Sequence, residues 1–109
     1  MIVFVSEQSG CQLLEFDDFR KFSVNIAAPM GRLDEWRKVA RDVVEFEDES
    51  TAWVSADALR NMPSVKGNAT WQSGLVRMIE KAKPHGWIRE APKLAIKAHV
   101  VWGASNARE

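Results

Sequence analysis

Two segments of this chain alternate apolar and polar residues with a period of two, and two others repeat apolar residues at helical spacing. Residues 21–29 and residues 94–102 show the alternation, which is typical of a strand with one buried face. Residues 33–44 and residues 71–82 carry apolar stripes at spacings of three and four, which is typical of an amphipathic helix. Because neither period fits the other element, the fold must combine strands and helices.

The weaker signals complete an order of elements. Residues 2–5 form a short apolar run that predicts a strand, and residues 11–16 suit the second arm of a hairpin. Residues 43–56 predict another hairpin. Ser55 is placed to N-cap a short helix over residues 56–62, and Asn68 or Thr70 is placed to N-cap the long one.

From Lys21 onward the predicted order is β-α-β-β-α-α-β. This order favours a ferredoxin-like, split β-α-β fold of the α+β class: an antiparallel sheet with both main helices on one face. The N-terminal strand or hairpin would then extend one edge of that sheet. An alternative is a different α+β arrangement in which the hairpin joins the sheet centrally.

The length predicts a single domain over residues 1–109, since domains usually have about 100–150 residues. Within it, residues 1–20 would be a strand or hairpin extension and residues 103–109 a loose tail. Apolar residues make up 46% of the chain and charged residues 28%, which indicates a globular protein.

Charge and cysteine usage bear on partners and compartment. Fifteen basic residues balance fifteen acidic ones, so we expect neither a nucleic-acid nor a membrane partner. One cysteine permits no internal disulfide, and no apolar run could cross a membrane, so we expect a cytoplasmic, soluble protein. Five tryptophans favour a buried interface, which predicts a homodimer.

Motifs for chemistry are missing from the sequence. It contains no dinucleotide or phosphate loop, no His-Glu-x-x-His and no Gly-x-Ser-x-Gly. One cysteine and two histidines cannot build a Cys-rich zinc site. We therefore expect no metal and no cofactor, and we lean against an enzyme.

The best candidate site is the face of the sheet that the helices would leave open. On the predicted strands this face carries Asn25, Trp53, Lys97 and His99. Imidazole, amide and indole groups together could bind a small polar or aromatic ligand. His99 is the candidate acid or base near neutral pH. The alternative is a solvated face, or one buried against a second copy.

Other features are explained better by structure than by function. His85 lies in a Lys-Pro-His-Gly segment that ends the long helix, and we expect Trp87 and Ile88 to fold back over that end. The acidic residues 45–49 lack the spacing of a calcium loop and predict a hairpin tip. The connection between the last two helices is too long for a helix-turn-helix.

Two classes of function remain. The first is a non-catalytic, homo-oligomeric binding or interaction protein. The alternative is a small-molecule-binding protein or modest enzyme that uses the open face around Asn25, Trp53 and His99.

Overall fold

The computed structural model describes residues 1–19, 21–91 and 93–103, which form three helices and one seven-stranded sheet. The strands are β1 (Ile2–Ser6), β2 (Gly10–Leu14), β3 (Ser23–Ile26), β4 (Val44–Phe46), β5 (Thr51–Ser55), β6 (Ile88–Arg89) and β7 (Ala95–Trp102). The helices are α1 (Leu33–Val39), α2 (Ala56–Arg60) and α3 (Ala69–Ala82), and α3 continues into a 3-10 turn, η1 (Lys83–His85).

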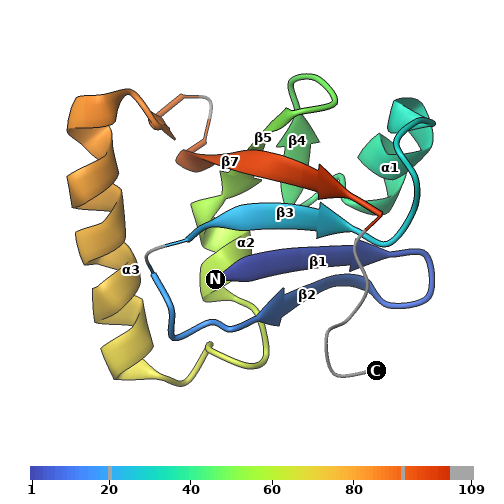
Figure 1. Cartoon of the computed structure of the whole chain (residues 1–109). Helices are drawn as coiled ribbons and strands as arrows, with labels where there is room; N and C mark the ends of the chain where they lie inside the picture. The colour runs from blue at the N-terminus through green and yellow to red at the C-terminus, as the bar shows by residue number, and fades with distance from the viewer. Residues whose placement is uncertain (20, 92, 104–109) are drawn as a thin grey trace.

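The sheet is mixed and curls into a half-barrel (Figure 1). Its order is β2-β1-β3-β7-β5-β4, with β6 added to the start of β7. β3 runs parallel to β1 and to β7, whereas the other pairs are antiparallel. α1 and α3 lie at opposite ends of the sheet, and α2 lies behind it (Figure 1).

The predicted ferredoxin-like sheet is therefore wrong. In that topology β3 would lie between β5 and β7 and run antiparallel to both, and both main helices would cover one face. Instead β7 lies between β3 and β5, because the parallel strand β1 occupies the other edge of β3. The predicted N-terminal hairpin is confirmed by the β1–β2 pairing, and its first strand changes the order of the whole sheet. Sequence periodicity locates strands but does not say which of them pair.

One face of the sheet forms the core. Cross-strand partners share a face, so Val3, Val24 and Val100 form one row, and each is at most 5% exposed. Leu59 of α2 is fully buried against this core. The predicted alternation is confirmed at Val24 and Ile26 and from Ile96 to Val100, where the residues between the buried ones are half-buried or exposed, whereas Ala95 at the start of β7 is buried together with Ile96.

Two predicted caps hold the helices that follow β5. The Ser55 hydroxyl accepts a hydrogen bond from the Ala58 N–H at 3.2 Å, and the Asn68 side chain accepts one from the Trp71 N–H at 3.0 Å. Each satisfies a backbone donor that the first helical turn leaves unpaired. α1 ends at Val39, five residues earlier than predicted, because the chain turns there and Val44 enters β4.

The chain after α3 differs from the prediction. Trp87 folds back in part, since its N–H donates a hydrogen bond to the Ala82 carbonyl at 3.3 Å and its ring stacks on His85, but it is 48% exposed, and Ile88 begins the short strand β6. Gly86 adopts a left-handed conformation with φ of 75°, which a glycine accepts without a steric penalty. Of the predicted tail, residues 104–109 lie outside the described residues. No helix of the described part is long and apolar enough to cross a membrane.

Candidate functional site

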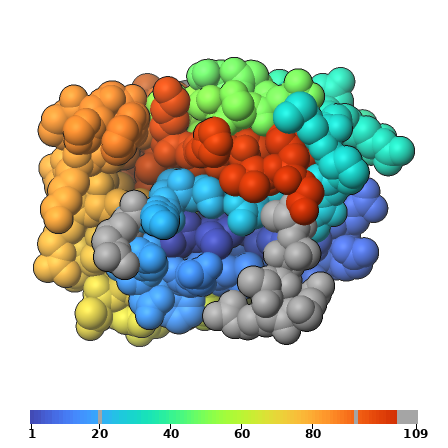
Figure 2. Space-filling model, in the orientation of Figure 1, coloured from blue at the N-terminus to red at the C-terminus, as the bar shows by residue number. Residues whose placement is uncertain are grey.

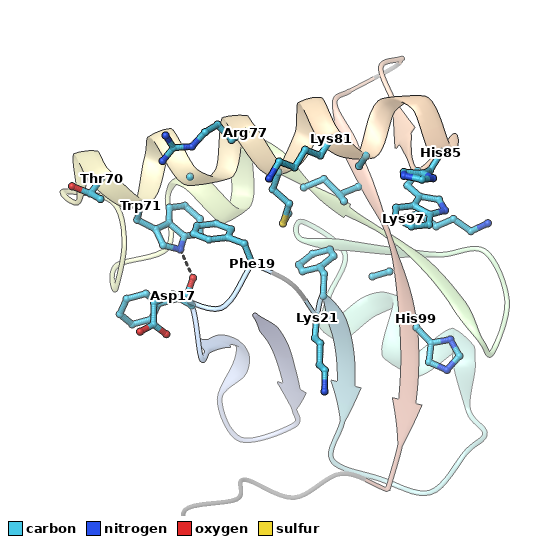
Figure 3. A pocket seen from close by; sticks show the side chains of 18 of the residues that line it. Asp17, Phe19, Lys21, Thr70, Trp71, Arg77, Lys81, His85, Lys97 and His99 are labelled. Atoms are coloured by element: carbon cyan, nitrogen blue, oxygen red, sulfur yellow. Dashed lines mark hydrogen bonds between the residues drawn. The ribbon is translucent and has the colours of Figure 1, made fainter.

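A cleft of about 990 Å³ lies between α3, the segment before β3 and the start of β7 (Figure 3). Its origin is visible in the strand register. β5 occupies one edge of β7, so β6 and β3 must share the other edge. β6 pairs with residues up to Ile96, and β3 starts only opposite His99. α3 lies beside this interruption and forms the side of the cleft (Figure 2).

Apolar side chains provide much of the lining. They come from three places in the sequence, and the largest are Phe16, Phe19, Phe22, Trp71, Met78 and Trp87. Trp71 and Met78 belong to the predicted apolar stripe of α3, and the buried residues of that stripe, Trp71, Leu75, Ile79 and Ala82, confirm it as core. The same helix face therefore serves both the core and the cleft.

Among the residues that the structure describes, four cationic side chains and one carboxylate also line the cleft. The cations are Lys21, Arg77, Lys81 and Lys97, and the carboxylate is Asp17. Both histidines of the chain, His85 and His99, line it as well. The cleft is thus strongly basic in a chain whose formal charge is zero.

One end of the cleft is fixed by tight packing. The indole N–H of Trp71 donates a hydrogen bond to the Phe16 carbonyl at 2.6 Å, and the rings of Phe19 and Trp71 lie 5.9 Å apart. Phe19 packs directly on Gly74, where an added Cβ would lie only 2.7 Å from two atoms of its ring. We call Phe16, Phe19, Trp71 and Gly74 the packed end.

The α-ammonium group of Met1 supports the segment that leads from the packed end to β3. It donates hydrogen bonds to the carbonyls of Asp18 and Lys21, the latter at 2.9 Å. Partial burial lowers the pKa of this group, although carboxylates nearby, that of Asp18 first, oppose the shift. The segment is therefore held from both sides, by the chain terminus and by α3.

The other end of the cleft is exposed. His85 and Trp87 stack with ring centroids 4.4 Å apart and an interplanar angle of 20°. The Trp87 carbonyl accepts a hydrogen bond from the Lys97 N–H at 2.8 Å, which brings η1 next to β7. Lys97 and His99 are two residues apart on β7 and share its outer face. We call His85, Trp87, Lys97 and His99 the open end.

Of the four residues predicted for a site, Lys97 and His99 line the cleft and Asn25 and Trp53 do not. All four lie on the predicted sheet face, but the strand of Trp53 flanks the last strand, β7, rather than the first. In register, Lys97 lies opposite Trp53, and His99 lies opposite Ser23. Whether any of them binds a ligand stays a prediction.

Asn25 and Trp53 have partners outside the cleft. The side-chain oxygen Oδ1 of Asn25 accepts a hydrogen bond from the Ser23 hydroxyl at 3.0 Å. The Trp53 indole donates to Glu47 at 3.1 Å and lies under the guanidinium of Arg89 at 5.2 Å from its centroid. These contacts hold both side chains against the sheet.

Sequence reasoning missed most of the cleft. The sequence predicts His85 and Trp87 at the end of a helix and assigns residues 17–20 to no strand or helix, so it brings neither group to a site. A signal was present there, since the sequence Phe-Asp-Asp-Phe-Arg-Lys-Phe interleaves aromatic and charged side chains without strand or helix period. Such a segment packs its rings on a neighbour and leaves its charges exposed.

The described residues contain no group of three or more metal-ligating side chains. In the acidic run, Asp48 closes the β4–β5 turn by accepting hydrogen bonds from the N–H groups of Ser50 and Thr51 at 2.8 and 2.9 Å. Those bonds, that of Ser50 first, lower the pKa of Asp48, while burial raises the pKa of the Cys11 thiol to about 11.

Comparison of the chain with protein-family models, with curated proteins and with solved structures gave no match. The chemistry of the cleft is therefore the basis for a functional proposal.

Proposed function

We propose that this protein binds a small molecule with an apolar body and an anionic group in the cleft beside α3. The volume of about 990 Å³ is at the upper end of the range of about 300–1,000 Å³ that is usual for ligand sites. Aromatic lining with a few charged groups is the usual composition of such sites. The alternative function predicted from the sequence, a small-molecule binder, is thus favoured, with a different set of residues.

The observation that carries the proposal is the local excess of positive charge. Of the described residues, four lysine or arginine side chains line the cleft against one carboxylate, whereas the whole chain has equal numbers of both signs. A cleft with apolar walls strengthens the field of such charges and attracts an oppositely charged ligand. Apolar lining alone would suit a neutral ligand, so the cations decide the ligand class.

The test compares two fluorescent probes that share a ring system. One is 8-anilinonaphthalene-1-sulfonate, and the other is N-phenyl-1-naphthylamine, which lacks the sulfonate. We expect the sulfonate to bind more tightly. Lys81→Gln should weaken its affinity by about threefold to fivefold, since a charge pair near a surface contributes about 1 kcal/mol or less. The affinity of the neutral probe should stay within about twofold, because it has no charge to lose a partner.

Lys83→Gln is the matched control. Lys83 follows Lys81 by two residues, does not line the cleft, and forms only exposed ion pairs with Glu80 and Glu90, at 3.5 and 4.0 Å. Both substitutions remove the same charge from the same region. Equal affinities for the two probes, or equal effects of the two substitutions, would refute the proposal.

The homodimer predicted from the sequence and the acid–base role predicted for His99 stay predictions. Light scattering on the purified protein tests the first, and an NMR titration of the imidazole tests whether the second has a suitable pKa.

A further inference from the structure

We infer that the ligand is an elongated molecule, an unbranched apolar chain with an anionic group at one end, and that Phe19 sets the length of chain that the cleft accepts. This inference rests on the proposed function and adds to it a ligand shape and the residue that selects for chain length. It is based on the shape of the cleft and on the contact between Phe19 and Gly74.

The cleft is long and narrow because it follows α3 along its length (Figure 3). One face of α3 and η1 lines it at spacings of three or four residues, from Thr70 through Gly74, Arg77 and Lys81 to His85. Over this stretch the helix and the 3-10 turn rise by about 20–25 Å. Spread over that length, the volume of about 990 Å³ corresponds to a mean width of about 7 Å. A helix with its side chains is about 10–12 Å across, so the cleft is too narrow for one and suits an extended molecule.

Phe19 reaches α3 part-way along the cleft. It belongs to the segment before β3, which forms the wall opposite α3. The three atoms nearest to a Cβ at position 74 would all belong to the Phe19 ring, two of them at 2.7 Å. The ring of Trp71, three residues earlier on the helix, lies 5.9 Å from that of Phe19. The Phe19 ring therefore joins the two walls of the cleft at Gly74.

This contact divides the cleft into unequal parts. From Gly74 to Thr70 the helix rises by about 6 Å, whereas from Gly74 to His85 it rises by about 17 Å. The lining cations of α3, Arg77 and Lys81, both lie in the longer part. Within the described part of the chain neither of them forms a salt bridge, so both are available to an anionic group.

An apolar chain bound by its anionic end at Lys81 meets Phe19 after at most about 10 Å, the rise of the helix from Lys81 to Gly74. Between these two points the lining includes Met78 of α3 and Phe22 of the opposite segment, both half-buried. Lys81 thus marks one end of the bound chain and Phe19 the other.

Removal of the Phe19 ring should join the two parts of the cleft. Gly74 has no side chain that could fill the space, so the longer part would extend to Thr70, by about 6 Å. At about 1.2 Å per bond of an extended chain, this distance admits four or five further methylene groups.

The experiment measures how well unbranched fatty acids, from hexanoate to hexadecanoate, displace 8-anilinonaphthalene-1-sulfonate. Each is used below its micelle-forming concentration at about pH 8, where carboxylates are ionised. In the wild-type protein the affinity should rise by up to about fourfold per methylene group and then level off at one chain length. In Phe19→Ala the rise should continue for about four more carbons. Adding Gly74→Leu to Phe19→Ala puts a side chain back into the space and should return the limit toward that of the wild type.

Phe22→Ala is the matched control. Phe22 is a second half-buried ring of the same segment that lines the cleft, but the atoms nearest to position 74 belong to Phe19. Its removal should weaken binding of all chain lengths by a similar factor and leave the limit where it is. Phe19→Leu keeps more of the packing on α3 and should move the limit by fewer carbons than Phe19→Ala. The urea midpoint of each variant shows whether it is folded.

The outcomes separate this inference from the proposed function. If the limit is unchanged in both Phe19 variants, or moves equally in Phe22→Ala, Phe19 does not set the chain length. If no fatty acid displaces the sulfonate probe, the ligand is not an elongated chain. In both cases the proposed function stands, because it requires only that the sulfonate bind more tightly than the neutral probe. Equal binding of those two probes overturns the proposed function itself.

Discussion

Trp71 and Trp87 line the same cleft, but Trp71 is 3% exposed and Trp87 is 48% exposed. Trp71 also donates its indole N–H to the Phe16 carbonyl and touches Phe19, whereas the ring contact of Trp87 is with His85. The packed end is thus built from groups that the fold requires. The open end consists of exposed side chains whose removal should cost little stability, and these are the groups that a ligand can use.

Truncating each tryptophan in turn tests most directly whether the two ends contribute differently to stability. Trp71→Ala should lower the free energy of unfolding by about 3–5 kcal/mol, the usual cost of removing a buried aromatic side chain. Trp87→Ala should lower it by less than about 1 kcal/mol, because the residue is half exposed. Urea denaturation followed by circular dichroism measures both, and Trp87→Ala should still weaken binding of the sulfonate probe.

Trp71→Phe serves as the control for size. It keeps most of the aromatic volume but leaves the Phe16 carbonyl without its donor, which should cost about 1–3 kcal/mol. Similar losses from Trp71→Ala and Trp87→Ala would contradict the division of the cleft into a packed and an open end.

A smaller effect is expected where Phe19 packs on α3. An alanine Cβ at position 74 would overlap the Phe19 ring, and we expect Gly74→Ala to lower the free energy of unfolding by about 1 kcal/mol. In a Phe19→Ala background the overlap disappears, and the same change should raise stability by about 0.5–1 kcal/mol because alanine favours the helix. A double-mutant cycle by urea denaturation gives the coupling.

If Gly74→Ala stabilises the protein equally in both backgrounds, Phe19 does not pack on this glycine and the packed end loses one of its contacts. The buried α3 residues Leu75 and Ile79 are untouched by these substitutions, so the cycle reports on this contact alone.

The sequence correctly predicted those local features that depend on a single strand or helix. The alternation around Val24 and Val100 predicted which face is buried, and the caps Ser55 and Asn68 were predicted from residue type and position. The strand order did not follow, because it depends on competition for the edges of β3. β1 takes one edge and β7 takes the other, and neither choice changes the hydrophobic pattern of any strand.

The site was predicted only in part for the same reason. Lys97 and His99 were assigned to the correct face of β7, since alternation alone determines it. Their neighbours in the cleft come from α3, from η1 and from residues 16–22, and these contacts depend on where α3 lies relative to the sheet. His85 is an example: the sequence predicted its position at a helix end but not its proximity to β7.

The smallest expected effect concerns Asp48, whose charge reaches the open end through Lys97. Hydrogen bonds from the Ser50 N–H and hydroxyl, and from the Thr51 N–H, hold its pKa below the ordinary value, and Lys97 adds a weaker effect of the same sign. Since folding lowers this pKa, the ionised Asp48 carboxylate stabilises the folded state at pH values above its ordinary pKa of about 3.9. This stabilisation is lost as the pH falls through the lowered value.

Lys97→Gln should raise the pKa of Asp48 slightly, as measured by an NMR titration of its carboxyl carbon, whereas Arg77→Gln should leave it unchanged. An equal response to both would mean that the two ends of the cleft share one electrostatic environment, which would contradict the division of the cleft into a packed and an open end.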